Sequence, residues 1–261
     1  MTTQITKRDE SQLAVASEVT EMFGGDTGIQ IPIDAPLPQV KILRETPQFE
    51  LPAGETVKTV EGHILFWHNA NQYYDAPFGD GDGNSAPTCA SSDGIRPNGG
   101  ESPLPGPCAT CELNQFGSAP AKDGEESRAK ACQNTIRMYL LLDGDVLPCV
   151  LKAPPSSLGK KDSLMRWLTN APNIASKAGI GTKYQPIRVR FSLHKKDFSS
   201  GMSASILDLE TVRVLDPNDD NDRGPLIQLS KLYKSFMDRY LGRIAQDVAA
   251  EKQETTDEAP F

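Results

Sequence analysis

The segment of residues 75–132 constrains the fold more than any other feature of this sequence. Gly, Pro, Ser, Asp and Asn dominate it, and its apolar residues follow neither helical nor strand periodicity. A loop of that length inside a compact domain is improbable unless something other than a hydrophobic core orders it. Four of the chain's five cysteines lie in the segment, at Cys89, Cys108, Cys111 and Cys132. These side chains are therefore the first candidates for what orders it.

The four cysteines predict one structural zinc site. Cys108 and Cys111 form a Cys-x-x-Cys pair that can bind one tetrahedral zinc, and Cys89 and Cys132 can complete the ligand set. A segment this polar cannot offset its ordering entropy by burial, whereas a zinc site supplies roughly 10 kcal/mol. Because four sulfur ligands leave no position open for water, the predicted zinc is structural and not catalytic.

Other interpretations of the cysteines stay open. His63 or His68 could replace one thiolate at the metal. The Cys-x-x-Cys pair could be a redox pair, although no βαβ pattern surrounds it, or the thiols could carry no ligand. Cys149 lies in the apolar stretch VLPCVLK and is expected to be a core residue.

Hydrophobic periodicity outside the insertion predicts a mainly β fold with some helix, of the α+β class. Strands are expected over residues 39–45, 49–51, 59–74 (with a bend at 69–71), 134–142, 146–152, 183–194 and 203–215, and helices over 7–23, 157–170 and 226–250. Around five main strands with a covering helix suit a small β-barrel, and an OB-like barrel is the preferred version. The expected organisation is an N-terminal arm over 1–35, a core over 36–250 interrupted by the zinc-binding insertion at 75–132, and a disordered acidic tail over 251–261.

Charge is distributed unevenly along the chain. The formal net charge is −8, yet between Lys130 and Ser200 there are 12 Lys and Arg residues against four Asp and Glu. Such a basic middle is either a solvated sheet face or a footprint for a polyanion. Single strands are held by basic grooves with aromatic rings on which bases stack. Candidate stacking residues are Trp67, Tyr73, Tyr74 and Tyr139, and candidate phosphate contacts are Arg137, Lys152, Lys160, Lys161, Lys183, Arg188, Arg190, Lys195 and Lys196.

The chain ends in Asp257-Glu258-Ala259-Pro260-Phe261. This end closely resembles the acidic tip, ending in Pro-Phe, of bacterial single-stranded DNA-binding proteins, where it docks replication and repair partners. An acidic tail ending in Phe is also a feature of some phage single-stranded DNA-binding proteins. A zinc-bearing insertion in an OB fold is similar to the arrangement in certain tailed-phage members, whose ligand set includes a histidine and whose spacing differs. The resemblance implies partner binding through Asp257, Glu258, Pro260 and Phe261.

The expectation is therefore a non-enzymatic protein that coats single-stranded DNA in replication, recombination and repair, in the cytoplasm of a bacterium or a phage-infected cell. No apolar run approaches the ~20 residues of a membrane helix, and residues 1–12 have no apolar core for a secretory signal. Two alternatives remain. One is a zinc-ribbon adaptor that binds proteins and no DNA. The other is a metal-dependent nuclease, for which loop carboxylates are available at Asp80, Asp82, Asp216, Asp219, Asp220 and Asp222.

Overall fold

The computed structural model describes residues 37–43, 46–75, 87–98, 106–120, 127–159, 161–197 and 203–257, with side chains up to residue 238. The chain divides into two units, Met1–Ala35 and Pro36–Phe261, and every described residue belongs to the second. The predicted N-terminal arm and its helix over 7–23 lie outside the described residues.

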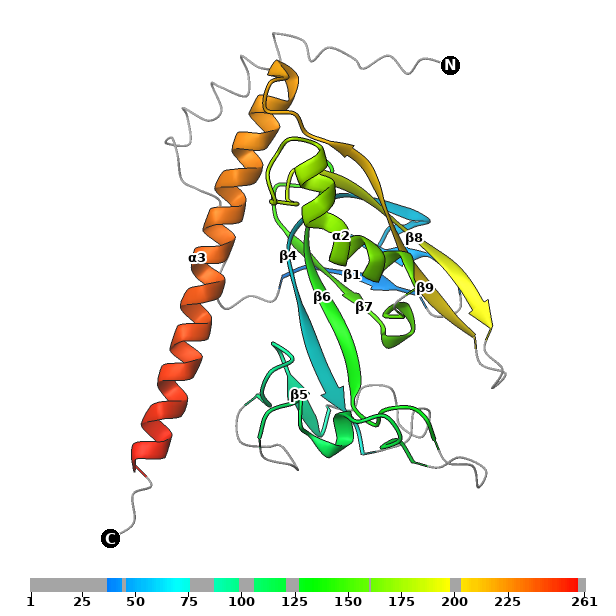
Figure 1. Ribbon diagram of the computed structural model, residues 1–261, viewed down its shortest axis with the longest axis vertical. Helices are drawn as coiled ribbons and strands as arrows, with labels where there is room; N and C mark the ends of the chain where they lie inside the picture. Colours follow the sequence, from blue (N-terminus) through cyan, green and yellow to red (C-terminus); the bar gives the residue numbers. More distant parts are fainter. Residues whose placement is uncertain are drawn as a thin grey trace. The chain divides into compact units, whose positions relative to one another are not determined.

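Nine strands form one sheet that curls into a half-barrel (Figure 1). The strands are β1 (Gln39–Ile42), β2 (Phe49–Glu50), β3 (Thr56–Val57), β4 (Thr59–Tyr73), β5 (Cys89–Ser91), β6 (Gln133–Leu142), β7 (Cys149–Ala153), β8 (Ile187–Asp197) and β9 (Ser203–Val214). Their order is β3-β2-β1-β7-β6-β4-β8-β9, with β5 beside β4. Only the β1–β7 pair is parallel among the described pairs. The expectation of a mainly β, barrel-like α+β fold is confirmed at this level.

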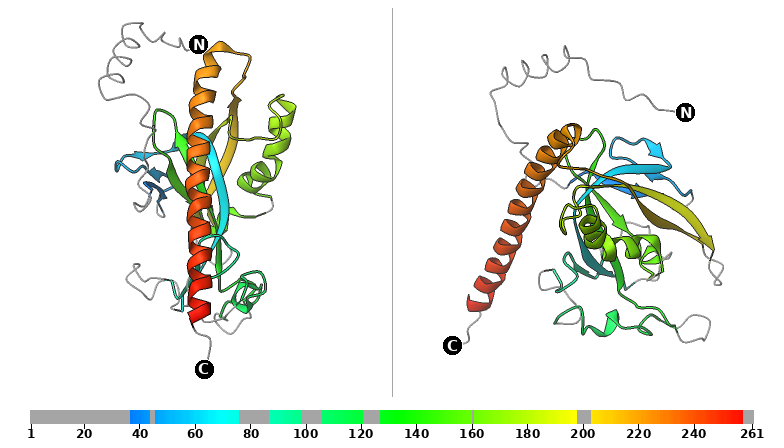
Figure 2. Two further views of the ribbon diagram at one scale, coloured as in Figure 1. Left: turned by 90° about the vertical axis from the view of Figure 1, so that its left-hand side faces the viewer. Right: turned by 45° about the horizontal axis from the view of Figure 1, so that its top comes forward.

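Alternation along the strands separates the two faces of the sheet. On β6 the side chains of Ile136, Met138 and Leu140 are buried in the main core, on the inner face, while Tyr139 and Leu141 point to the outer face. The two longer helices follow this division (Figure 2). Helix α2 (Ser163–Lys177) packs its apolar side into the inner core, whereas α3 (Asp220–Asp257) packs on the outer cluster. The core therefore lies between the curled sheet and α2.

Helix α2 begins later than the sequence predicts. Residues 155–157 form a short 3-10 turn, η2 (Pro155–Ser157), and the helix begins at Ser163 instead of residue 157. The Ser157 hydroxyl does not cap a helix, because it accepts a hydrogen bond from the Leu207 amide of β9 at 2.8 Å. The Ser163 hydroxyl accepts likewise from the Leu209 amide at 3.1 Å. These hydroxyls bond amides on the side of β9 away from β8.

Helix α3 is longer than predicted at both ends. It begins at Asp220 instead of residue 226, and Asp222 in its first turn is buried, forms an ion pair with Arg213 and accepts a hydrogen bond from the Asp216 amide. It also continues to Asp257, through most of the segment 251–261 that was predicted to be disordered. Strong helix formers dominate residues 243–257, and neither Gly nor Pro interrupts them, which explains the extension.

Strand β4 also differs from its prediction. It continues without interruption through the predicted bend at residues 69–71 and ends at Tyr73. The irregularity lies earlier, between Ile64 and Phe66, where the register with β6 shifts. Polar residues at 69–71 stay in the strand because the Asn71 side chain is buried and hydrogen-bonded there.

A search of the described helices finds none with both the length and the apolar character needed to span a membrane.

Candidate functional site

The cysteine module, defined as the described residues 87–98, 106–120 and 127–132, is carried by the far end of the β4–β6 ribbon (Figure 1). Strand β5 begins at Cys89, which pairs with Tyr73 at the end of β4. Cys132 directly precedes β6, whose first residue pairs with Gln72. Two cysteines that are far apart in the sequence are thus brought to the two strands that flank the end of β4.

Backbone hydrogen bonds place the Cys-x-x-Cys pair over these strand ends. The Cys108 amide donates to the Ile95 carbonyl at 2.8 Å, and the Cys132 amide donates to the Leu113 carbonyl at 2.8 Å. Cys111 precedes the 3-10 turn η1 (Glu112–Asn114), and its carbonyl accepts from the Asn114 amide at 3.0 Å. The loop is folded back onto the ribbon by these bonds and not by an apolar core.

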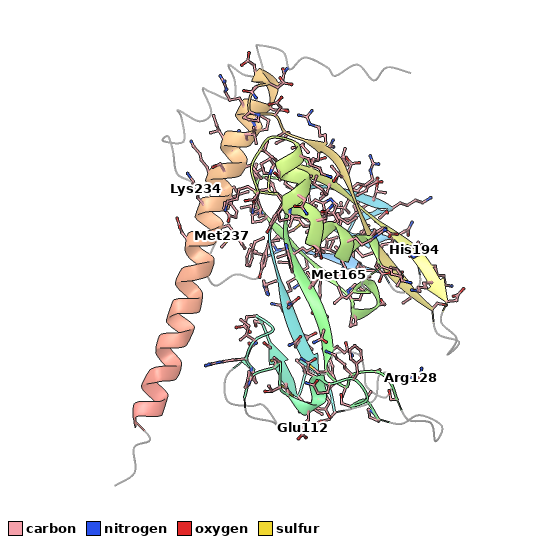
Figure 3. All side chains as sticks on the ribbon, in the orientation of Figure 1. Glu112, Arg128, Met165, His194, Lys234 and Met237 are labelled. Atoms are coloured by element: carbon pink, nitrogen blue, oxygen red, sulfur yellow. The ribbon has the colours of Figure 1, made fainter. Side chains whose placement is uncertain are left out.

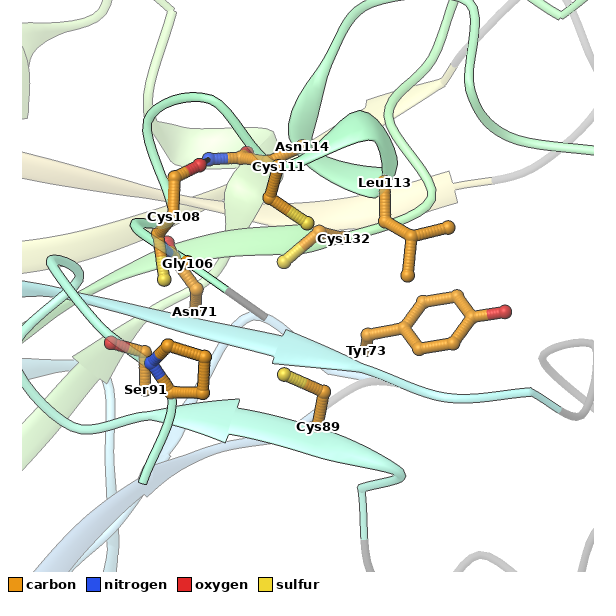
Figure 4. Close-up of a pocket in the computed structure, with 11 residues that line it drawn as sticks. Asn71, Tyr73, Cys89, Ser91, Gly106, Cys108, Cys111, Leu113, Asn114 and Cys132 are labelled. Atoms are coloured by element: carbon orange, nitrogen blue, oxygen red, sulfur yellow. Dashed lines mark hydrogen bonds between the residues drawn. The ribbon is translucent and has the colours of Figure 1, made fainter. Parts of the chain in front are cut away.

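All four cysteines line one small cavity, with their sulfur atoms directed toward its interior (Figure 4). The cavity volume is about 20 Å³, which is room for roughly one water-sized particle. Burial and the three neighbouring thiols of Cys108, Cys111 and Cys89 raise the pKa of Cys132 to about 11. In the described part of the chain, no group of three or more His, Cys, Asp or Glu side chains lies close enough together to hold a metal ion.

The donor set nevertheless fits a structural zinc. None of the four thiols is in a disulfide, and a tetrahedral site needs four soft ligands around one ion-sized space. The two histidines considered as substitutes lie elsewhere. His63 Nδ1 donates to the Gln185 carbonyl at 2.9 Å, and His68 Nδ1 donates to the Asn69 carbonyl at 2.8 Å. Cys149 is buried in the main core, as expected.

A network of three asparagines supports the module, and the sequence interpretation missed it. The Asn114 side chain donates to the Cys108 carbonyl at 2.7 Å and accepts from Asn134 at 2.9 Å. Asn134 also donates to Asn71 Oδ1 at 2.7 Å, and the two residues pair in register across β4 and β6. The available signal was the position of Asn114, three residues after Cys111, together with Asn residues where apolar strand residues would be expected.

The predicted phosphate contacts Arg188 and Arg190 share one face of β8, but carboxylates already neutralise both. Arg188 pairs with Glu61 at 2.7 Å and with Asp143, and Arg190 pairs with Glu61 at 2.6 Å and Glu210 at 2.8 Å. Hydrogen bonding to these acids raises the pKa of each guanidinium. This cluster therefore carries two positive and three negative charges.

A second basic group forms no ion pair with an acid in the part of the chain that the structure describes. Lys152, Arg137 and His68 lie in register across β7, β6 and β4 on the outer face of the sheet. We call these three residues, with Gln72, the cationic face. None of the ion pairs between described residues includes Arg137 or Lys152. Lys152 Nζ donates to Gln72, and burial together with the Arg137 charge lowers the pKa of Lys152.

His68 contributes a polar ring to this face and little charge. Burial, followed by the nearby Arg137, lowers the pKa of His68, although its hydrogen bond to Asn69 acts in the opposite direction. In the neutral form, with the proton on Nδ1, Nε2 accepts from the Tyr139 hydroxyl at 3.1 Å. The positive charge of the cationic face therefore comes from Arg137 and Lys152.

The predicted stacking residues are divided among three environments. Trp67 packs against the inner core and not on the outer face. Tyr139 lies on the outer face, but its ring packs against Phe66 and against Phe236 of α3, with centroids 6.2 and 4.8 Å away. Tyr73 lines the cysteine cavity, and a hydrogen bond to Asp75 raises the pKa of its phenol. Tyr74 follows the end of β4 and is half-buried.

The remaining basic candidates do not join the cationic face. Lys161 and Lys183 are exposed in loops, and Lys195 and Lys196 are exposed near the end of the β8–β9 hairpin. Lys160 and the predicted partner-binding residues Glu258, Pro260 and Phe261 lie outside the described residues, and Asp257 is described only as the last residue of α3.

The acids of the nuclease alternative serve the start of α3. Asp216 accepts from the Asn218 amide at 2.8 Å, Asp219 accepts from the Asn221 amide at 2.9 Å, and Asp222 pairs with Arg213. Asp80 and Asp82 lie outside the described residues. The described acids of this alternative thus already have partners in a turn and a helix start.

Comparison with known proteins finds no family model, no curated protein and no solved structure that matches this chain.

Proposed function

We propose that this protein binds single-stranded DNA and holds one structural zinc in the cysteine module. In this proposal the curled sheet is an OB-like barrel, and the module is a zinc-binding insertion between β4 and β6. The acidic C-terminal tip recruits replication and recombination proteins by placing its terminal Phe in an apolar pocket of the partner.

The observation that carries the DNA-binding proposal is the unneutralised pair Arg137 and Lys152. Two cations in neighbouring register positions repel one another, and the lowered pKa of Lys152 reflects burial first and then this repulsion. A phosphate placed between them would relieve the repulsion and form charge-assisted hydrogen bonds. The outer face also offers Gln72 and His68 as neutral polar groups beside these cations.

The zinc supplies order and no chemistry in this proposal. Cys89, Cys108, Cys111 and Cys132 would hold it, and the asparagine network would keep the Cys108 loop on the ribbon. Ligation by four thiolates would release the thiol protons, and metal binding would thereby couple to folding of the module.

The test is titration of the zinc-loaded full-length protein into a labelled oligo-dT, followed by fluorescence anisotropy, with duplex DNA as competitor. We expect binding that prefers the single strand and weakens by about tenfold or more in the double variant Arg137→Gln/Lys152→Gln. The matched control is Arg166→Gln/Lys177→Gln, which removes two exposed cations from α2 on the inner side. If the control variant loses affinity for oligo-dT and Arg137→Gln/Lys152→Gln does not, the assignment of DNA binding to the cationic face is wrong.

Absence of any binding, also in a variant that lacks Glu258–Phe261 and so cannot compete with DNA through its own acidic tip, would refute the proposal. The adaptor alternative would then be favoured, since it requires the zinc module and the tail but no DNA.

A further inference from the structure

The cysteine module exposes one aromatic side chain that neither the fold nor the zinc site requires. Phe116 is 82% exposed, more than any other large hydrophobic residue in the described part of the chain. A single exposed apolar side chain needs no explanation by itself. Phe116 differs because the ammonium group of Lys130 lies over its ring, 5.0 Å from the centroid. An exposed ring and a cation are thus held together in one place.

The backbone around Phe116 is fixed by hydrogen bonds on both sides. Gly117, which has a positive φ of 90°, donates to the Ala129 carbonyl at 3.0 Å. The Ser118 hydroxyl donates to the Leu113 carbonyl at 2.8 Å and accepts from the Ala131 amide at 3.0 Å. Hydrogen bonds therefore hold the turn that carries the Phe116 ring. Because the turn is already ordered, less conformational entropy is lost when a ligand stacks on the ring.

The position of Lys130 is fixed as well. Its Nζ donates to Asn114 Oδ1 at 3.2 Å, so the asparagine network that supports the cysteines also supports this cation. Arg128 is exposed two residues away in the same segment of the module (Figure 3). Neither Arg128 nor Lys130 takes part in an ion pair between described residues.

From this geometry we infer that Phe116 is a base-stacking platform for single-stranded nucleic acid and that Lys130 and Arg128 contact the adjoining phosphates. Lys130 lies over one face of the ring, and an unpaired base stacks on the other. This inference deepens the proposed function and rests on it. It also supplies what the cationic face lacks, because the Tyr139 and Phe66 rings there already pack against Phe236.

A stacking platform makes a specific thermodynamic prediction, because only a ligand with bases can use it. Phe116→Ala should weaken binding of oligo-dT by about 5- to 100-fold, the usual effect of removing one stacking ring. It should leave unchanged the affinity for an abasic oligonucleotide of the same length, which keeps every phosphate. Phe116→Tyr should retain binding to oligo-dT, whereas Phe116→Leu, which is apolar without a π face, should not.

The matched control is Ile95→Ala, which removes the other strongly exposed apolar side chain of the module, 63% exposed. Zinc stoichiometry is measured on every variant, so that a disrupted module is distinguished from a lost contact. Phe116→Trp gives a second readout, because a stacked base should quench the new indole fluorescence beyond any change in the parent.

The outcomes separate the inference from the proposed function. If the parent binds oligo-dT and Phe116→Ala binds equally well, or if the abasic oligonucleotide loses as much affinity as oligo-dT, the platform is refuted while DNA binding stands. If the parent binds no DNA at all, both are refuted. Unchanged indole fluorescence on saturation of Phe116→Trp with oligo-dT would also overturn the inference.

Discussion

The salt dependence of DNA binding should distinguish the two basic groups of the sheet. Arg137 and Lys152 have no acidic partner among the described residues, so each is available to displace a counterion from a phosphate. Each such contact contributes about 0.7 to the slope of log K against log salt for a single strand. The double variant Arg137→Gln/Lys152→Gln should therefore reduce the magnitude of this slope by about 1.4.

That change is large enough to measure. Between about 50 and about 200 mM salt, a slope difference of about 1.4 corresponds to a roughly sevenfold smaller loss of affinity in the variant than in the parent. Fluorescence anisotropy with oligo-dT at five or six salt concentrations gives both slopes. Each variant is first checked by circular dichroism and zinc content.

The informative comparison is Arg188→Gln/Arg190→Gln. These guanidiniums already pair with Glu61, Asp143 and Glu210, so a phosphate would have to displace carboxylates to reach them. Their removal should leave the slope nearly unchanged. If this variant instead flattens the slope as much as Arg137→Gln/Lys152→Gln does, the reasoning from ion pairing is wrong and the DNA lies over β8.

Three further predictions concern the module and the fold. Cys108→Ser should abolish stoichiometric zinc binding in a metal-release assay, whereas Cys149→Ser, in the core, should leave it intact. Asp222→Ala should lower the free energy of unfolding in urea by about 1–3 kcal/mol, because it leaves the Asp216 amide and the Arg213 guanidinium without the buried carboxylate that accepts from both, while the 94% exposed Asp220 should tolerate Ala within about 0.5 kcal/mol. Burial raises the pKa of Tyr184 from 10.0 to about 12, so its contribution to stability is present below pH 10 and lost as the pH rises toward 12. Tyr184→Phe should show a smaller loss of stability over that range in urea titrations, and an equal loss would contradict the assignment.

Local patterns predicted the elements of the sheet well. The apolar pattern predicted a strand over residues 134–142, and β6 forms there with Ile136, Met138 and Leu140 buried. The same local reasoning could not decide which side chains of β4 are buried after residue 66, where the pairing with β6 has shifted register. The register shift between Ile64 and Phe66 depends on pairing with β6, which is distant in the sequence. Trp67 consequently faces the core, whereas its neighbour Phe66 packs against Tyr139 on the outer face.

Sequence reasoning about charge failed for a similar reason. Arg188 and Arg190, two residues apart in β8, lie on one face of the strand. Their partner Glu61 lies 129 residues from Arg190 along the chain, and only the fold brings it within 2.6 Å. Local charge balance therefore predicted a basic surface where the tertiary structure makes a neutralised one. Cysteine spacing was more informative about placement, since all four predicted ligands line one cavity, while the zinc itself stays a prediction.

The hydroxyl groups that bond β9 have a consequence for how copies of this protein can associate. An unpaired strand edge is a template onto which another chain can add a strand. Here Ser157 and Ser163 occupy the outward amides of Leu207 and Leu209, and the opposite end of the sheet is the two-residue strand β3. Among the residues that the structure describes, neither end offers a continuous row of donors and acceptors to a second molecule. Sheet extension from one molecule into the next is therefore disfavoured.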